Sequence, residues 1–295
     1  MKILVAGRSG QVAQSLAAIS TPERHFVTLG RPELDICDPA SVAAAIHEHQ
    51  PAALINAAAY TAVDRAESEP EAAFAANETG PRVLATAARE AGIPILHIST
   101  DYVFAGNKDG FYTEDDPVDP QSVYGRSKLA GERAVAEANP DHVILRTAWV
   151  FSPYGNNFVK TMLRLAADRD TVRVVADQWG SPTYAPDIAE GLAKILDQAL
   201  ASPADPIWRG TFHMTAAGTC TWADFAEEIF RQSAERGGPS AKVERITTAE
   251  YPTPAKRPAN SQLDNGMFAR AFNFTLPAWQ DGTRRCLEAL KQASS

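Results

Sequence analysis

Near its N-terminus the chain reads Ile3-Leu4-Val5-Ala6-Gly7-Arg8-Ser9-Gly10-Gln11-Val12-Ala13. The apolar run over residues 3–6 is typical of a buried strand, and the apolar spacing over residues 11–19 is typical of a helix. Gly7 and Gly10 lie in the turn between them, where glycine lets the chain bend sharply and lets a diphosphate approach the helix N-terminus. An ordinary glycine turn is the alternative, but its place at the start of a strand–helix alternation favours a dinucleotide site.

Short apolar runs alternate with helix-like segments through the first half of the chain. The expected helices are rich in alanine and amphipathic, and small side chains let helices pack closely on a sheet. Alternation of strand and helix predicts an α/β protein with a doubly wound, Rossmann-type parallel sheet. The expected strands cover residues 3–6, 26–29, 53–55, 95–98 and 143–145, and the expected helices cover residues 11–19, 41–49, 70–91 and 124–139.

The pattern loosens after residue 150. Residues 252–260 hold three prolines and no regular period, and residues 233–240 are linker-like but too few to separate independent domains. We therefore expect an NAD(P)-binding Rossmann domain over residues 1–150. Residues 151–295 are expected to form mainly a smaller, irregular α/β substrate lobe, with some segments returning to the first domain. The helices expected in this half cover residues 157–167, 185–200 and 222–232.

Charge and composition exclude several classes of protein. The chain has 28 Lys and Arg against 36 Asp and Glu, and the net charge of −8 disfavours binding to a nucleic-acid backbone. Three widely spaced cysteines without a Cys-x-x-Cys pair suit a reducing compartment. The histidines form no metal-ligand cluster, and no apolar run is long enough for a signal peptide or a membrane span. We expect a cytoplasmic protein with no nucleic-acid, membrane or metal partner.

The residues after the second expected strand bear on the choice of cofactor. An acidic residue there is typical of NAD enzymes, whereas a basic residue accommodates the 2′-phosphate of NADP. Arg31 follows that strand, which favours NADPH and leaves NADH open. Asp35 and Ile36 follow closely and are candidates for contact with the adenine, although Asp35 could equally serve only in a turn.

A set of proton-transfer groups lies beyond the strand over residues 95–98. Ser99 and Thr100 follow that strand, and ligands of open α/β sheets bind at the carboxyl ends of strands. Tyr124 and Lys128 are four residues apart, which puts them on one face of a helix. The Lys128 ammonium should lower the pKa of the Tyr124 phenol, and the Thr100 hydroxyl can bond the same substrate oxygen. The Tyr-x-x-x-Lys pattern alone is a weak signal, because it occurs by chance in many proteins. Together with the glycine turn and the hydroxyls at the strand end, it indicates a catalytic site.

These motifs together resemble the dTDP-4-dehydrorhamnose reductase family, within the extended subgroup of the short-chain dehydrogenase/reductase superfamily. The resemblance runs from residue 1 to about residue 290, and its later motifs are more specific than the superfamily pattern. Besides the glycine turn, Ser99 to Phe104 and Tyr124 to Lys128, it rests on the segments at residues 56–67, 146–150, 155–158, 177–183 and 257–261.

The resemblance implies NADPH-dependent reduction of the C4 keto group of dTDP-4-dehydro-L-rhamnose to dTDP-L-rhamnose. Tyr124 would be the general acid, Lys128 would bind the nicotinamide ribose and tune Tyr124, and Thr100 would complete the triad. The cofactor would contact Gly7, Gly10, Gln11, Val12, Arg31, Asp35, Ile36, Ala57, Ala58, Ala59, Tyr60, Ser99, Tyr124 and Lys128. The nucleotide-sugar substrate would contact Thr100, Tyr102, Trp149, Arg257, Asn260 and Ser261.

Several of these positions have a purely structural alternative. Asn56 could cap or bridge strands, and residues 64–67 could be only a solvated helix start. Trp149 could belong to the core, because tryptophan is usually largely buried. Asn77 could support the catalytic residues or lie on a helix surface, and Asp101 is better suited to a turn or cap than to proton transfer.

Other functions stay open at this stage. One is reduction of a different nucleotide 4-keto-6-deoxy sugar, which only a substrate panel separates from the first. Another is a non-catalytic NADP-binding regulatory subunit, like the fold relative that serves methionine adenosyltransferase, but Thr100, Tyr124 and Lys128 argue against it. Some relatives hold a divalent ion such as Mg²⁺ at a dimer contact. Here Gln14-Ser15 stands at that region without a carboxylate, which argues against the metal and leaves a homodimer open.

Overall fold

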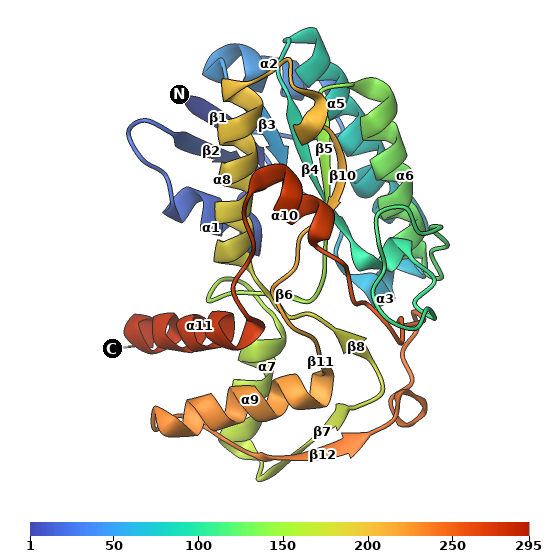
Figure 1. Ribbon diagram of the computed structural model, residues 1–295, viewed down its shortest axis with the longest axis vertical. Coiled ribbons are helices and arrows are strands. Elements are labelled where there is room, and N and C mark those ends of the chain that lie inside the picture. The colour runs from blue at the N-terminus through green and yellow to red at the C-terminus, as the bar shows by residue number, and fades with distance from the viewer. Residues whose placement is uncertain (295) are drawn as a thin grey trace.

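Six parallel strands form the central sheet of the computed structural model, which describes residues 1–294. Their order across the sheet is β10-β5-β4-β3-β1-β2 (Figure 1). The predicted doubly wound parallel sheet is therefore confirmed. The strands are β1 (Lys2–Ala6), β2 (His25–Leu29), β3 (Ala53–Asn56), β4 (Ile95–Thr100), β5 (His142–Thr147) and β10 (Gly210–His213).

Helices cover both faces of the sheet because side chains alternate between the two faces along each strand. Ile3 and Val5 pack in a core with the helices of one face, and Leu4 and Ala6 pack in a second core with those of the other. The first face carries α1 (Gln11–Ala18), α8 (Ala185–Ala201) and α10 (Gly266–Phe272), and the opposite face carries α2 (Pro39–His49), α5 (Gly80–Glu90) and α6 (Val123–Ala138) (Figure 1).

The predicted single helix over residues 70–91 is wrong, because the helical segment is interrupted. It divides into α4 (Pro70–Phe74), a π-helical turn η1 (Ala75–Thr79) and α5. Pro81 has no N–H to donate to the carbonyl four residues earlier, that of Asn77, so regular α-helical bonding cannot continue through this point. The turn instead buries the side chain of Asn77, which is 1% exposed. A short helix α3 (Val63–Ala66) precedes α4.

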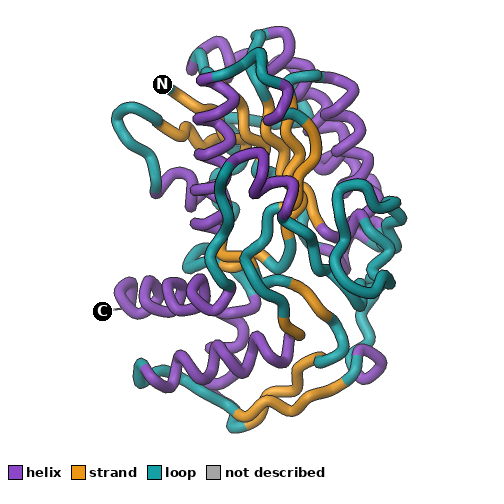
Figure 2. Tube along the Cα trace, in the orientation of Figure 1, coloured by secondary structure: helices purple, strands orange, loops and turns teal. Residues whose placement is uncertain are grey.

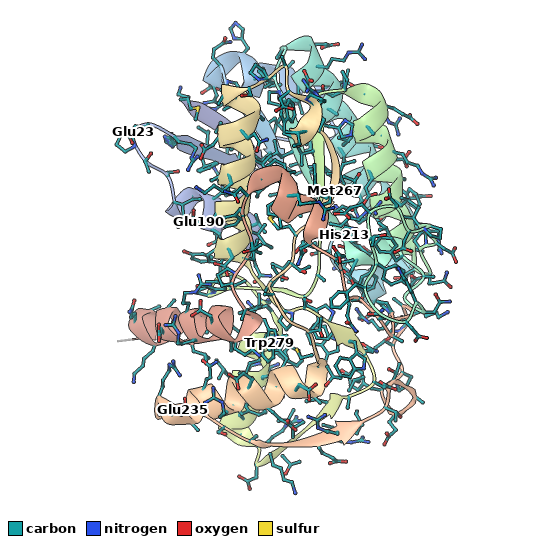
Figure 3. The ribbon with its side chains drawn as sticks, viewed as in Figure 1. Glu23, Glu190, His213, Glu235, Met267 and Trp279 are labelled. Atoms are coloured by element: carbon teal, nitrogen blue, oxygen red, sulfur yellow. The ribbon has the colours of Figure 1, made fainter. Side chains whose placement is uncertain are left out.

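The second lobe is built on three helices, α7 (Phe158–Asp168), α9 (Trp222–Glu235) and α11 (Trp279–Ser294). Their aromatic and aliphatic side chains form a separate core, in which the ring centroid of Trp279 lies 5.7 Å from that of Phe225 on α9 (Figure 3). Small two-stranded sheets border it: β7 (Thr171–Val175) with β12 (Lys242–Ile246), β8 (Trp179–Gly180) with β11 (Cys220–Thr221), and β6 (Val150–Phe151) with β9 (Thr183–Tyr184).

The chain crosses between the lobes more than once (Figure 2). Elements α8, β10 and α10 follow residue 150 yet pack in the core of the first lobe, where Met267 on α10 is partly buried (Figure 3). Three 3-10 turns complete the connections: η2 (Asp101–Val103), η3 (Pro206–Trp208) and η4 (Thr248–Glu250).

No helix in residues 1–294 is long and apolar enough to cross a membrane. The three cysteines are unpaired thiols. Over the same described residues, His, Cys, Asp and Glu side chains form no group of three or more that could hold a metal ion.

Candidate active site

The site begins where β1 and β3 end side by side. The chain passes from β2 to β3 across β1, and this reversal of strand order is where ligands bind in open α/β sheets. Gly7 has φ +125°, and a Cβ there would lie 3.2 Å from the carbonyl carbon and oxygen of Ala57. Gly10, the N-cap of α1, places no side chain over the helix N-terminus. The backbone N–H groups of that first turn can therefore meet an anion.

A cavity of about 190 Å³ lies beside this turn. It unites six of the residues predicted for the cofactor: Gly7, Arg31, Asp35, Ile36, Ala58 and Ala59. The sequence analysis missed the rest of its lining, Leu29, Gly30, Leu34, Cys37 and Ala76. Their position was the one available signal: Leu29 and Gly30 lie at the carboxyl end of β2, Leu34 lies in the loop that follows, and Ala76 follows α4.

Charge at the rim of this cavity is carried by two arginines. Arg31 contacts both oxygens of Asp35, at 3.0 Å from Nε and 3.1 Å from Nη2, and this hydrogen-bonded guanidinium lowers the pKa of the Asp35 carboxyl. Arg8 pairs with Glu33 at 2.8 Å and, with its Cβ against Gly30, is a second cation near the same strand end. Arg8 was not among the residues predicted to contact the cofactor, although it lies in the glycine turn itself.

Two residues predicted for the diphosphate use their side chains elsewhere. The Val12 side chain is buried in the core of the first lobe. The Gln11 amide reaches the second lobe: its Oε1 accepts from Ser152 Oγ at 2.8 Å and from Asn157 Nδ2 at 3.0 Å, and its Nε2 donates to the Val150 carbonyl at 3.2 Å. Only the backbone N–H groups of these two residues are left to face a diphosphate.

The predicted catalytic residues meet where β4 ends against the start of α6. Thr100 ends β4, and its hydroxyl is near enough to the Tyr124 phenol to lower the pKa of that phenol. The Tyr102 ring stands edge-on to that of Tyr124, with centroids 5.4 Å apart. A Cβ at Gly125 would lie 2.3 Å from the Tyr102 carbonyl oxygen, so glycine is what lets α6 approach this closely. Lys128 is 2% exposed, one turn along α6.

The electrostatics of this group differ from the expectation. Burial raises the pKa of the Tyr124 phenol, and the nearby Asp101 and Tyr102 raise it further, against the lowering effect of the Thr100 hydroxyl. Burial also lowers the pKa of Lys128 to about 8. The ammonium donates to the Ile98 carbonyl at 2.6 Å. The expected lowering of the Tyr124 pKa is therefore wrong for this structure, because desolvation of the phenolate outweighs its hydrogen bonding.

The supporting residues behind this group are buried. Asn77 bonds the backbone of Tyr60 and donates to Ser127 Oγ at 2.9 Å, so its placement on a helix surface is wrong. Asn56 serves as a bridge: its Nδ2 lies 2.9 Å from His97 Nδ1 and its Oδ1 accepts from the Ala58 amide at 3.1 Å.

The expected substrate side centres on Arg257. Its Nη1 donates to the Tyr102 hydroxyl at 3.0 Å, and its Nη2 pairs with Asp64 Oδ2 at 2.6 Å. The alternative that residues 64–67 are only a solvated helix start is wrong. Asp64 holds Arg257, and Glu67 Oε1 accepts from the Val123 amide at the start of α6, at 2.8 Å.

The remaining substrate candidates make contacts within the chain. Trp149, with φ +50°, stacks on Trp222 at a centroid distance of 3.5 Å and packs on Gly180, at the edge of the second-lobe core. Asn260 Nδ2 donates to the carbonyls of Lys108 at 2.7 Å and Gly110 at 2.6 Å. Both protons of that amide are thus used by the backbone, and the contact of Asn260 with substrate stays a prediction. Ser261 Oγ donates to Asp101 Oδ2 at 2.5 Å.

The family described as RmlD substrate binding domain matches residues 1–292. The chain belongs to this family. A Sinorhizobium fredii protein named dTDP-4-dehydrorhamnose reductase is 49% identical to this chain over 290 residues, which cover 98% of this chain and 98% of the relative. The resemblance predicted from the motifs is confirmed.

Solved structures agree with the RmlD assignment. A dTDP-4-dehydrorhamnose reductase from Clostridium acetobutylicum superposes with a TM-score of 0.90 at 39% identity, covering 99% of this chain and 100% of that one. A dTDP-4-dehydrorhamnose reductase from Bacillus anthracis, solved in complex with NADP, superposes with a TM-score of 0.90 at 35% identity, covering 98% and 99%.

Proposed function

We propose that this protein reduces the C4 keto group of dTDP-4-dehydro-L-rhamnose to dTDP-L-rhamnose with NADPH as the reductant. The observation that carries the proposal is that Thr100, at the carboxyl end of β4, lies beside Tyr124 on α6, with Lys128 one turn further along that helix. Relatives of 49% and 39% identity named for this reaction support it.

The chain has a suitable place for the dinucleotide. The uncapped N-terminus of α1 suits a diphosphate, and the cavity lined by Arg31, Asp35 and Ile36 suits an adenosine. Arg31 and Arg8 supply positive charge for a 2′-phosphate. Bound NADPH supplies the hydride, and the Bacillus anthracis relative that binds NADP supports this choice of cofactor.

Tyr124 is the proposed general acid. Because burial raises the pKa of its phenol, Tyr124 keeps its proton at neutral pH and can give it to the carbonyl oxygen as negative charge develops there. The nearby Thr100 hydroxyl is proposed to bond the same carbonyl oxygen of the substrate. Lys128, with a pKa near 8, stays mainly cationic at neutral pH and stabilises negative charge on this side of the sheet.

The substrate is proposed to lie between the two lobes. Residues 1–150 would mainly bind the dinucleotide and residues 151–295 mainly the nucleotide sugar. Arg257, held by Asp64 and Tyr102, offers a guanidinium to a diphosphate, and the partly buried Trp149 offers an apolar wall to the sugar. Three unpaired cysteines fit the cytoplasm as the place of this reaction.

The test follows NADPH absorbance while purified protein acts on dTDP-4-dehydro-L-rhamnose generated in situ. Wild type should oxidise NADPH, and Tyr124→Phe should lose about 10²–10⁴-fold in kcat. Tyr251→Phe is the matched control, because that tyrosine is 61% exposed and lies outside the site. Oxidation only with another nucleotide 4-keto-6-deoxy sugar would change the assigned substrate. NADPH binding without turnover of any of these sugars would favour the regulatory-subunit alternative and overturn the proposal.

A further inference from the structure

The side-chain amide of Gln11 connects the glycine turn to the start of the second lobe. Its Oε1 accepts from Ser152 Oγ at 2.8 Å and from Asn157 Nδ2 at 3.0 Å, and its Nε2 donates to the Val150 carbonyl at 3.2 Å. Both lone pairs of the amide oxygen and one of the two N–H groups are therefore used by the second lobe, although Gln11 opens the helix that follows the glycine turn.

The bridge ends on the segment that runs from β6, between the two lobes, into α7 (Figure 1). Asn157 is the N-cap of α7, where its Oδ1 accepts from the Lys160 amide at 3.2 Å. Its Nδ2 also donates to the carbonyl of Ser152 at 2.7 Å, and Ser152 is fully buried. Because these groups are bonded to one another as well as to Gln11, the amide holds this segment as a unit against α1.

Trp149, directly before β6, has a backbone conformation that needs support. Its φ of +50° lies in the left-handed region, which a residue with a Cβ adopts only where its surroundings hold it there. Its carbonyl accepts from the Thr183 amide at 3.1 Å, and its indole stacks on Trp222 with centroids 3.5 Å apart. Gln11 binds the carbonyl of the next residue, Val150. Trp149 is thus held by the second lobe on one side and by Gln11 on the other.

We propose that Gln11 is a positioning residue for the nucleotide sugar, because its amide holds Val150 and with it the Trp149 indole; this rests on the proposed function, which places that indole against the sugar. The backbone N–H groups at the start of α1 stay with the dinucleotide diphosphate. Gln11 therefore serves both ligands: its main chain faces the dinucleotide, and its side chain shapes the sugar site.

Two other roles for the Gln11 amide predict different results. If the amide turned toward the cofactor, its loss would raise the KM for NADPH and leave the KM for the keto sugar unchanged. If it only sealed the contact between the lobes, its loss would lower the stability of the protein and leave both KM values unchanged. Neither role requires that Trp149 move.

The first measurement compares the steady-state kinetics of Gln11→Met with those of the wild type. Methionine has a side chain of similar length and similar helix propensity, but it has no N–H to donate to the Val150 carbonyl. The KM for the keto sugar should rise about 5- to 20-fold, while kcat and the KM for NADPH stay within about twofold of wild type. A rise in the KM for NADPH alone, or no change in either KM, would overturn the proposal.

Gln14→Met is the matched control. Gln14 lies on the same helix and is also partly buried, but its Nε2 donates to the Ser9 carbonyl at 2.7 Å, inside the glycine turn. Its replacement removes a hydrogen bond from the turn and none from the second lobe, so the KM for the keto sugar should not change. An equal rise of this KM in Gln14→Met and Gln11→Met would assign the effect to the turn and contradict the bridge.

A second measurement does not depend on turnover. In protein labelled with fluorotryptophan, the fluorine NMR signal of Trp149 is identified by its loss in Trp149→Phe, and stacking on Trp222 shifts it through the ring current. Gln11→Met should move this signal toward that of free fluorotryptophan. Ser152→Ala removes one hydrogen bond from the other end of the bridge and should move it the same way by less. An unmoved signal in Gln11→Met overturns the proposal, as does one in Ser152→Ala if Gln11→Met does not fold.

Binding of the reduced sugar separates this proposal from the proposed function. Calorimetry with dTDP-L-rhamnose is done with NADPH present, which cannot react with this product. Gln11→Met should weaken dTDP-L-rhamnose about 5- to 20-fold and dTDP less than about twofold, because the indole is proposed to contact the sugar. Equal weakening of the two ligands would contradict a role at the sugar. A wild type that fails to oxidise NADPH with the keto sugar overturns the proposed function, and the Trp149 signal still decides whether Gln11 holds the indole.

Discussion

Asn77 is fastened to the backbone of Tyr60 by two hydrogen bonds: Oδ1 accepts from the Tyr60 amide at 2.8 Å, and Nδ2 donates to the Tyr60 carbonyl at 3.1 Å. The same Nδ2 donates to Ser127 on α6, whose hydroxyl donates to the Tyr124 carbonyl. One buried side chain thus joins the segment after β3 to the turn of α6 that carries Tyr124.

Replacing Asn77 should destabilise the protein as well as the site. Asn77→Ala leaves the partly buried Tyr60 amide and carbonyl without these partners, so the free energy of unfolding should fall by about 2 kcal/mol. Urea unfolding measures this, and Asn107→Ala, at an exposed side chain, is the control. Equal losses in the two variants would contradict the role given to Asn77.

Gly131 should tolerate no side chain. A Cβ there would lie 1.9 Å from the Asn77 carbonyl oxygen, so Gly131→Ala must push α6 away from the π-helical turn. We expect a loss of about 2–3 kcal/mol in unfolding free energy and a fall in kcat, because Tyr124 is on the same helix. Gly92→Ala is the comparison: its position has φ +67° but open space, so only backbone strain of about 1–2 kcal/mol should result. A Gly131→Ala chain as stable as Gly92→Ala would refute the close contact.

Lys128 should lower stability while serving the reaction. Burial lowers its pKa from the ordinary 10.5 to about 8, so below pH 8 the folded chain carries the full penalty of a buried ammonium. Lys128→Met should therefore be inactive yet more stable at pH 7, by on the order of 3 kcal/mol before the lost bond to Ile98 is subtracted.

The pH dependence gives the sign of this effect. Between pH 8 and 10.5 the unfolded chain keeps the Lys128 proton and the folded chain has lost it, so wild-type stability should rise toward that of Lys128→Met. Chemical unfolding across this range measures the difference between the two proteins. A constant difference would show that the buried charge is not its cause.

Arg31 should discriminate between the two nicotinamide cofactors. Arg31→Leu removes a guanidinium beside the cavity proposed for the adenosine, so kcat/KM with NADPH should fall about tenfold or more while kcat/KM with NADH changes little. Initial rates with each cofactor measure the ratio. Arg164→Leu, at an exposed position on α7, should leave both rates unchanged. Equal losses with NADPH and NADH would mean that Arg31 does not contact the 2′-phosphate.

Local features of the chain were the most predictable. The β1 turn and the strand–helix alternation follow from apolar period and glycine placement, and both depend on neighbouring residues alone. The helix over residues 70–91 was less predictable, because whether Pro81 bends a helix, ends it or widens it to a π-turn depends on what packs against it. Here α6, through Gly131, lies against the Asn77 carbonyl, to which Pro81 has no N–H to donate.

The sequence by itself determined the parallel sheet, the glycine turn for a dinucleotide, and the candidates Thr100, Tyr124 and Lys128. The tertiary structure alone decided which polar side chains pair across the chain: Arg257 with Asp64, Gln11 with the second lobe, and Asp101 with Ser261. These bonds join residues far apart in the chain, and no local period encodes them. They form only because packing of the two lobes removes water and leaves each buried polar group to find a partner within the protein.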